Sequence, residues 1–184
     1  MKFFDLPRTT LVLGGAASGK SLFAEQLIQG TGRPRRYIAT AEAWDAEMRA
    51  KIVHHRAQRG PDWDTVEAPL DLSTALRRTP TGHAVLVDCL TLWLTNHLLA
   101  EADLDLCRTD LCATLADLTG PIVLVSNEVG QGIVPDTALS RRFRDAQGQL
   151  NRVIAAQADL VVAVIAGLPL ALKGRLPEQT GDHQ

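Results

Sequence analysis

The sequence predicts an α/β fold with a mainly parallel central sheet that helices cover on both faces. Three observations support this prediction. Apolar runs rich in Val, Ile and Leu recur along the chain, which is typical of strands buried on both faces. Stretches of helical character separate these runs, and such alternation is typical of a parallel sheet. A glycine-rich segment from Gly14 to Ser21 joins the first apolar run to the first helical stretch.

The elements follow from these patterns in chain order. The first strand is expected at 10–13, because Leu11-Val12-Leu13 runs without interruption into the glycines. Further apolar runs predict strands at 36–40, 84–88, 121–126 and 159–166. Helices are expected at 20–29, 43–59, 70–78, 90–102, 104–118 and 138–157. The chain length favours one domain, expected over 1–173, followed by a loose, mostly polar tail at 174–184.

Composition excludes several classes of protein. The formal net charge of −2 argues against nucleic acid as the main partner. The three cysteines have neither zinc-ligand nor redox-motif spacing, so they are expected to be reduced thiols of a cytoplasmic protein. Asp5 and Pro7 interrupt the start of the chain where a signal peptide needs an apolar core. No apolar stretch reaches the length of a membrane span, so we expect a soluble, cytoplasmic chain.

The glycine-rich segment carries the strongest functional signal. It reads Gly14-Gly15-Ala16-Ala17-Ser18-Gly19-Lys20-Ser21, which matches G-x-x-x-x-G-K-[ST] between a strand and a helix. Glycines allow the backbone N–H groups to converge on a phosphate, and the helix start adds its positive dipole end. Lys20 is expected to reach the β- and γ-phosphates, and the Ser21 hydroxyl to ligate Mg²⁺. The sequence therefore predicts a nucleoside triphosphate site in a P-loop NTPase fold of the RecA-like type.

A magnesium site also needs a carboxylate. Ala84-Val85-Leu86-Val87-Asp88 is an apolar run that ends in an acid, which suits a buried strand delivering Asp88 beside the phosphates. Asp88 can equally serve as the N-cap of the helix expected at 90–102, and the two roles are compatible.

The helix expected at 43–59 places polar residues at the end of an apolar stripe. Trp44, Met48, Ile52 and His55 share one face, and Arg59 follows four residues further on. From the residues alone, two interpretations of His55 remain open. It is either a half-buried histidine near the helix C-terminus, where a cation is favoured, or a functional group.

Several further segments of the chain form recognisable motifs. They are H-R-x-x-R followed by W-x-T-x-E, N-E-V-G-x-G-I-V-P, and R-x-F-R-D. In this chain they are His55-Arg56-Ala57-Gln58-Arg59, Trp63-Asp64-Thr65-Val66-Glu67, Asn127 to Pro135, and Arg141-Arg142-Phe143-Arg144-Asp145. Taken together with the glycine-rich segment, they resemble one enzyme family, the bifunctional adenosylcobinamide kinase/adenosylcobinamide-phosphate guanylyltransferase of cobalamin biosynthesis, and the resemblance runs from about residue 10 to residue 173.

The resemblance implies two reactions. A nucleoside triphosphate phosphorylates the aminopropanol hydroxyl of adenosylcobinamide, and GTP then transfers GMP to that phosphate. In the family the second step passes through a guanylyl-histidine, which here corresponds to His55, with the adjacent His54 as the alternative. A neutral imidazole nitrogen is a competent nucleophile toward phosphorus, since its ordinary pKa is about 6.5. Arg56 and Arg59 are placed to neutralise charge on the phosphoryl oxygens.

The resemblance also assigns further residues to the nucleotide site. Ala39, Thr40 and Ala41 are expected near the nucleotide, Asp88 near Mg²⁺, and Glu67 at the guanine edge. Asn127, Glu128 and the glycine-containing loop to Pro135 are expected to face the corrinoid or the metal. Arg142 and Arg144 either meet a phosphate or form a solvated helix face.

The expected ligands are Mg²⁺, with GTP and ATP as substrates, and the corrinoid adenosylcobinamide with its phosphate. The family implies a homo-oligomer, a trimer. Two other functions remain open at this stage: a P-loop kinase for another small alcohol without nucleotidyl transfer, and a nucleotide-dependent switch that acts through a partner protein.

Overall fold

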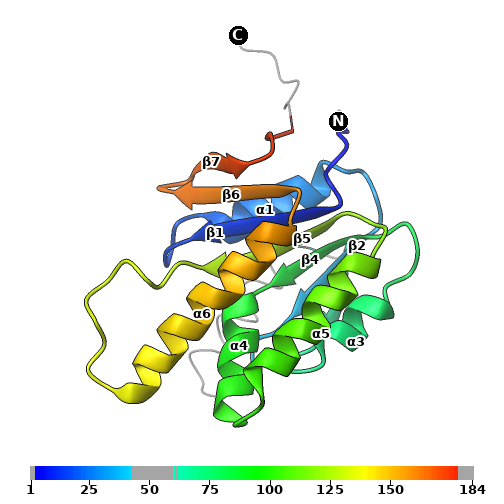
Figure 1. Cartoon of the computed structure of the whole chain (residues 1–184). Coiled ribbons are helices and arrows are strands. Elements are labelled where there is room, and N and C mark those ends of the chain that lie inside the picture. The colour runs from blue at the N-terminus through cyan, green and yellow to red at the C-terminus, as the bar shows by residue number, and fades with distance from the viewer. Residues whose placement is uncertain (1–2, 43–59, 61, 178–184) are drawn as a thin grey trace.

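The computed structural model describes residues 3–42, 60 and 62–177, and it has the expected α/β architecture (Figure 1). The seven strands are β1 (Thr9–Gly14), β2 (Arg35–Ala39), β3 (Trp63–Glu67), β4 (Ala84–Asp88), β5 (Ile122–Asn127), β6 (Leu160–Ile165) and β7 (Leu168–Lys173). The helices are α1 (Lys20–Gln29), α3 (Leu72–Arg77), α4 (Leu90–Leu99), α5 (Leu104–Asp117) and α6 (Ala138–Gln157). The helix expected at 43–59 lies outside the described residues.

The strands form one sheet in the order β3-β2-β4-β5-β1-β6-β7. Every neighbouring pair is parallel except β6 and β7, so the expected mainly parallel sheet is confirmed. Because side chains alternate along a strand, each central strand buries apolar residues on both faces. All the parallel strands therefore end at one edge of the sheet, where the loops that follow them gather.

Helices cover both faces of the sheet. On one face, α1 packs Ala24, Leu27 and Ile28 against a buried cluster that includes Val12 and Leu86. On the opposite face, α3, α4, α5 and α6 contribute to a second cluster, and Figure 1 shows α4, α5 and α6 lying together on that side. None of the described helices combines the length and the apolarity that a membrane crossing requires.

Two strands were not expected from the sequence. Residues 63–67 form β3, a parallel edge strand with its Trp63 side chain buried. Residues 168–173 form β7, an antiparallel strand that follows a two-residue turn at Ala166-Gly167. Both turn residues have positive φ angles, 51° and 79°, as a type I′ hairpin requires. The strand expected at 159–166 is therefore β6, which ends at Ile165, where the chain reverses direction.

Candidate nucleotide-binding site

The glycine-rich loop lies between β1 and α1, as the sequence predicts. Gly19 has φ of 91°, a left-handed conformation that favours glycine, and it precedes the first residue of α1. A Cβ atom on Gly14 would lie 2.7 Å from the Val164 carbonyl oxygen, so only glycine fits there. A Cβ atom on Gly15 would meet nothing within 4 Å, so neither strain nor crowding requires glycine at that position.

Lys20 folds back over this loop. Its Nζ donates a hydrogen bond to the Gly15 carbonyl oxygen at 3.1 Å, which holds the ammonium group over the loop. Ser21 follows in the first turn of α1 and is half-buried. The N-terminus of α1 therefore presents an ammonium group, a hydroxyl and the first N–H groups of a helix to the same small volume, which favours a phosphate anion.

The turn between β6 and β7 packs against the glycine-rich loop. The Gly167 N–H donates to the Ser18 carbonyl oxygen at 2.9 Å, and a Cβ on Gly19 would lie 3.3 Å from Gly167 Cα. The turn at Ala166-Gly167 therefore contacts the glycine-rich loop directly.

Asp88 lies at the C-terminal end of β4, half-buried at the edge of the sheet. The Tyr37 hydroxyl donates to its Oδ2 at 3.1 Å and so orients the carboxylate. Cys89 follows, and burial raises the pKa of its thiol to about 11, with a further increase from the Asp88 charge. The thiol therefore stays protonated at neutral pH.

Thr40 is fully buried beside Asp88 and Cys89. Its Oγ1 donates to the Cys89 carbonyl oxygen at 2.6 Å and accepts from the Cys89 N–H at 2.8 Å. Its carbonyl oxygen accepts from Asn96 Nδ2 at 2.9 Å. These bonds tie the end of β2 to the start of α4, and they commit the Thr40 hydroxyl to the protein interior.

The strand order sets the spacing of the site. Since β5 separates β1 from β4, the glycine loop and Asp88 lie two strands apart, roughly 10 Å. The ends of β2, with Ala39, Thr40 and Ala41, lie one strand further along the same edge. Glu67 ends β3, four strands from β1, which is roughly 19 Å from the loop.

The structure thus brings the glycine loop, Lys20, Ser21 and Asp88 to one edge of the sheet, and it leaves Glu67 exposed at the far end of that edge. His54, His55, Arg56 and Arg59 lie outside the described residues. Within the described part of the chain, no group of three or more His, Cys, Asp or Glu side chains is arranged to hold a metal ion. A metal here would need oxygen ligands from the nucleotide as well.

Sequence reasoning missed the residues that hold this edge in place. Tyr37 orients Asp88, Asn96 holds Thr40, and Thr91 Oγ1 accepts from the Asn127 N–H at 2.8 Å. These contacts join different strands and helices, so no local spacing in the sequence signals them. The one available signal is that Thr91 and Asn96 are polar residues among the leucines of α4, a signal that Thr95 and His97 share.

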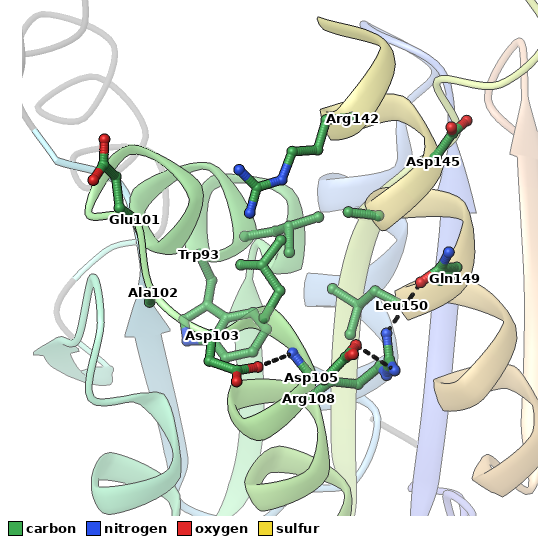
Figure 2. Close-up of a pocket in the computed structure, with 13 residues that line it drawn as sticks. Trp93, Glu101, Ala102, Asp103, Asp105, Arg108, Arg142, Asp145, Gln149 and Leu150 are labelled. Carbon is green, nitrogen blue, oxygen red and sulfur yellow. Dashed lines mark hydrogen bonds and ion pairs between the residues drawn. The ribbon is translucent and has the colours of Figure 1, made fainter. Parts of the chain in front are cut away.

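A cavity of about 640 Å³ lies between α4, α5 and α6, and no residue of the glycine loop lines it. Figure 2 shows the Arg142 side chain pointing toward this cavity, while Arg108 on its opposite side is held by Asp105 and Gln149. Arg144 instead lines a groove of about 680 Å³ with Leu13, at the end of the glycine-loop strand. Arg142 and Arg144 therefore line different surfaces.

The fold and the glycine loop define a P-loop NTPase of the RecA-like type. Two solved structures with similar folds are the flagellar accessory protein FlaH from Methanocaldococcus jannaschii and the type III secretion ATPase EscN from enteropathogenic E. coli. FlaH aligns with a TM-score of 0.52 at 13% identity, over 92% of this chain and 80% of its own. EscN aligns with a TM-score of 0.56 at 13% identity, over 87% of this chain and 43% of its own. At this identity the likeness shows the fold alone.

The family model for cobinamide kinase / cobinamide phosphate guanyltransferase matches residues 10–172. The chain is 50% identical to the bifunctional adenosylcobalamin biosynthesis protein CobP of Pseudomonas aeruginosa, over 89% of this chain and 96% of that protein. It is 38% identical to the corresponding protein CobU of Salmonella typhimurium, over 89% of this chain and 98% of that protein. The chain belongs to the cobinamide kinase / cobinamide phosphate guanyltransferase family, as the resemblance of its motifs predicted.

Proposed function

We propose that this chain phosphorylates adenosylcobinamide with a nucleoside triphosphate and then transfers GMP from GTP to the phosphate, giving adenosylcobinamide-GDP. The observation that carries the proposal is the glycine loop with Lys20 folded over it, at a sheet edge shared with Asp88, in a chain whose family match spans residues 10–172.

In the first reaction, the aminopropanol hydroxyl oxygen attacks the γ-phosphorus. The bond from that phosphorus to the bridging oxygen breaks, the nucleoside diphosphate leaves, and the hydroxyl proton is released. Lys20 neutralises charge on the β- and γ-phosphate oxygens, and the loop N–H groups orient the triphosphate. This reaction needs positioning more than covalent participation by the protein, so the pre-formed loop is the main requirement.

The residues present fit a bound Mg²⁺. Magnesium in nucleotide sites takes one or two protein oxygens and completes its shell with phosphate oxygens and water. Ser21 Oγ and the Asp88 carboxylate supply such a pair, Ser21 in the helix that follows β1 and Asp88 at the end of β4, two strands away in the sheet. When bound, the ion would neutralise charge on the β- and γ-phosphate oxygens. The Tyr37 hydroxyl keeps Asp88 oriented for this role.

In the second reaction, an imidazole nitrogen of His55 attacks the α-phosphorus of GTP and pyrophosphate leaves. The phosphate of adenosylcobinamide phosphate then attacks the same phosphorus and releases the imidazole. Two easier transfers thus replace one difficult transfer. Arg56 and Arg59 supply positive charge to the phosphoryl oxygens, and Glu67 accepts hydrogen bonds from the guanine edge. Ala39, Thr40 and Ala41 line the same nucleotide.

The experiment is covalent labelling with GTP that carries radioactive α-phosphate. Wild type and His54→Ala should retain an acid-labile label after denaturation, and His55→Ala should retain none. The adjacent His54 is the matched control, because both substitutions remove an imidazole at neighbouring positions in the sequence. Label retained in His55→Ala and lost in His54→Ala would move the nucleophile by one position. An unlabelled wild type would remove the guanylyl intermediate from the proposal.

The chain is further proposed to act in the cytoplasm as a homo-oligomer, a trimer by family resemblance. The exposed leucines of β7 support a subunit contact, because Leu168, Leu170 and Leu172 share one face of an edge strand and are 58–73% exposed. Light scattering coupled to gel filtration measures the number of subunits directly.

A further inference from the structure

Asn127 occupies the central position of the nucleotide edge. It ends β5, directly opposite Gly14 of β1 in the register, and β5 lies between the glycine-loop strand and the Asp88 strand. Its side chain shares a face of β5 with Val123 and Val125, which pack in the cluster beneath α1. The Asn127 carboxamide therefore points to the face of the sheet on which α1 and Lys20 lie.

The carboxamide oxygen of Asn127 is buried and accepts no hydrogen bond from any described residue. A buried acceptor without a partner destabilises a fold by about 1–3 kcal/mol. Such a group at the edge that carries the phosphate loop is explained if a ligand supplies the missing donor. The carboxamide is neutral, so it accepts a hydrogen bond there without repelling the anionic phosphates.

The backbone of Asn127 is fixed on both sides. Its N–H donates to Thr91 Oγ1 at 2.8 Å, and its carbonyl oxygen accepts from Asn151 Nδ2 at 3.1 Å. The next N–H, that of Glu128, donates to the Gly14 carbonyl oxygen at 3.1 Å. Asn127 is thus connected to α4, to α6 and to the glycine loop at once.

Behind it lies a polar cluster in the core, formed by Ser126, Gln147 and Asn151, which are at most 6% exposed. Ser126 Oγ donates to Asn151 Oδ1 at 2.7 Å. Gln147 Nε2 donates to Ser126 Oγ at 2.9 Å and to Asn151 Oδ1 at 3.0 Å. The neighbouring α6 residues Leu150 and Ile154 belong to the apolar core. The three polar side chains therefore hydrogen-bond to one another within apolar surroundings, and these bonds fix the Asn151 amide.

We propose that the Asn127 carboxamide oxygen accepts a hydrogen bond from an O–H group at the γ-phosphate end of the nucleotide, and that Ser126, Gln147 and Asn151 are the positioning residues that hold Asn127 there. The O–H group is either the attacking alcohol or a water on the metal. This inference rests on the proposed phosphorylation reaction and adds a residue to its site. Fixed hydrogen-bond partners of this kind contribute to rate because they need no reorganisation when the reaction occurs.

The first test is Asn127→Ala, with steady-state phosphorylation of adenosylcobinamide and calorimetry of nucleotide binding. The rate constant kcat should fall by about 100-fold, while the nucleotide Kd stays within about threefold, because the group acts on the O–H donor rather than on the phosphates. A kcat within about threefold of wild type would overturn the inference. A Mg²⁺ titration identifies the donor: a raised half-saturating concentration in the variant indicates metal-bound water, and an unchanged one indicates the alcohol.

The second test is a double-mutant cycle that a merely structural role would not satisfy. Asn151→Leu should lower kcat by about tenfold in the wild-type background and hardly at all in Asn127→Ala, because the positioned group is then absent. Equal losses in both backgrounds would overturn the positioning role. Gln157→Ala is the matched control: it lies on the same helix, loses a bond of 2.9 Å to the Cys112 carbonyl, and should keep kcat.

Thr91 provides a variant pair that keeps the test valid if Asn151→Leu folds poorly. Thr91→Ser retains the hydroxyl that holds the Asn127 N–H, and Thr91→Val removes it at nearly constant shape. Serine should restore kcat to within about threefold and valine should not, at equal urea midpoints. Equal kcat in the two variants would count against the positioning of Asn127. Turnover by wild type and its loss in Lys20→Ala test the proposed function separately, since neither depends on Asn127.

Discussion

Replacing Thr40 by valine should destabilise the chain, although the two side chains have nearly the same size and shape. Valine keeps the shape of threonine but removes the hydroxyl that bonds both polar groups of Cys89. The Cys89 carbonyl keeps a second donor, the Trp93 N–H at 3.2 Å, so it stays satisfied. The Cys89 N–H loses the hydrogen bond to Thr40 Oγ1, in a residue that is 7% exposed. One buried orphan N–H costs about 1–3 kcal/mol, and we expect about 2 kcal/mol in total.

The assay is urea unfolding followed by circular dichroism. With a slope of about 2 kcal/mol per molar urea, the midpoint should fall by about 1 M. Thr114→Val is the control, because Thr114 is also buried and its hydroxyl donates to the Asp110 carbonyl at 2.8 Å within α5. That carbonyl already serves the helix, so the control should lose less than about 1 kcal/mol. Equal midpoints for the two valine variants would refute the assignment of an orphaned Cys89 N–H.

Three further outcomes follow from the site. Lys20→Ala should weaken nucleotide binding and lower both reactions together, since one loop serves both; loss of phosphorylation with intact guanylylation would demonstrate two nucleotide sites. Gly19→Ala should lower the free energy of unfolding by about 1–2 kcal/mol, because φ is 91° and the new Cβ approaches Gly167, whereas Gly15→Ala should not. Iodoacetamide at pH 8 should leave Cys89 unmodified until urea unfolds the chain, because burial raises the pKa of its thiol to about 11. Peptide mass spectrometry measures the modified fraction of Cys89, and modification of the folded chain would contradict the prediction.

The sequence predicted the local features of this fold well and the edge strands poorly. The first strand, the glycine loop and α1 are adjacent in the chain, so their order alone defines the phosphate site. The two edge strands were not predicted, for physical reasons. β3 carries exposed Asp64 and Glu67 among its five residues, so it has no continuous apolar run. β7 contains Pro169, which is tolerated because the strand lies at the sheet edge, a position that no sequence pattern reveals.

The candidate site likewise contains residues that the local sequence reveals and residues whose place depends on the order of the strands. Asp88 is at a strand end, so an apolar run followed by an acid was sufficient to find it. The role of Asn127 as the residue between Asp88 and Gly14 depends on β5 lying between β4 and β1. Strand order is set by long-range packing, and β5 is separated from β4 by two helices in the chain. The cluster of Ser126, Gln147 and Asn151 likewise joins residues from two elements.

The two proposed reactions need positive charge at different phosphorus atoms of the triphosphate. Among the described residues assigned to the nucleotide site, Lys20 is the only cation, and Asp88 and Glu67 are anionic. Backbone N–H groups and a metal ion must therefore neutralise most of the triphosphate during phosphorylation, and all the groups proposed for that step lie at the described edge. Transfer of GMP develops charge at the α-phosphorus instead, further from Lys20. The cations proposed for it, Arg56 and Arg59, follow the proposed nucleophile His55 in the sequence. In the proposed scheme, the two activities thus depend on different charged groups, which act at opposite ends of the triphosphate.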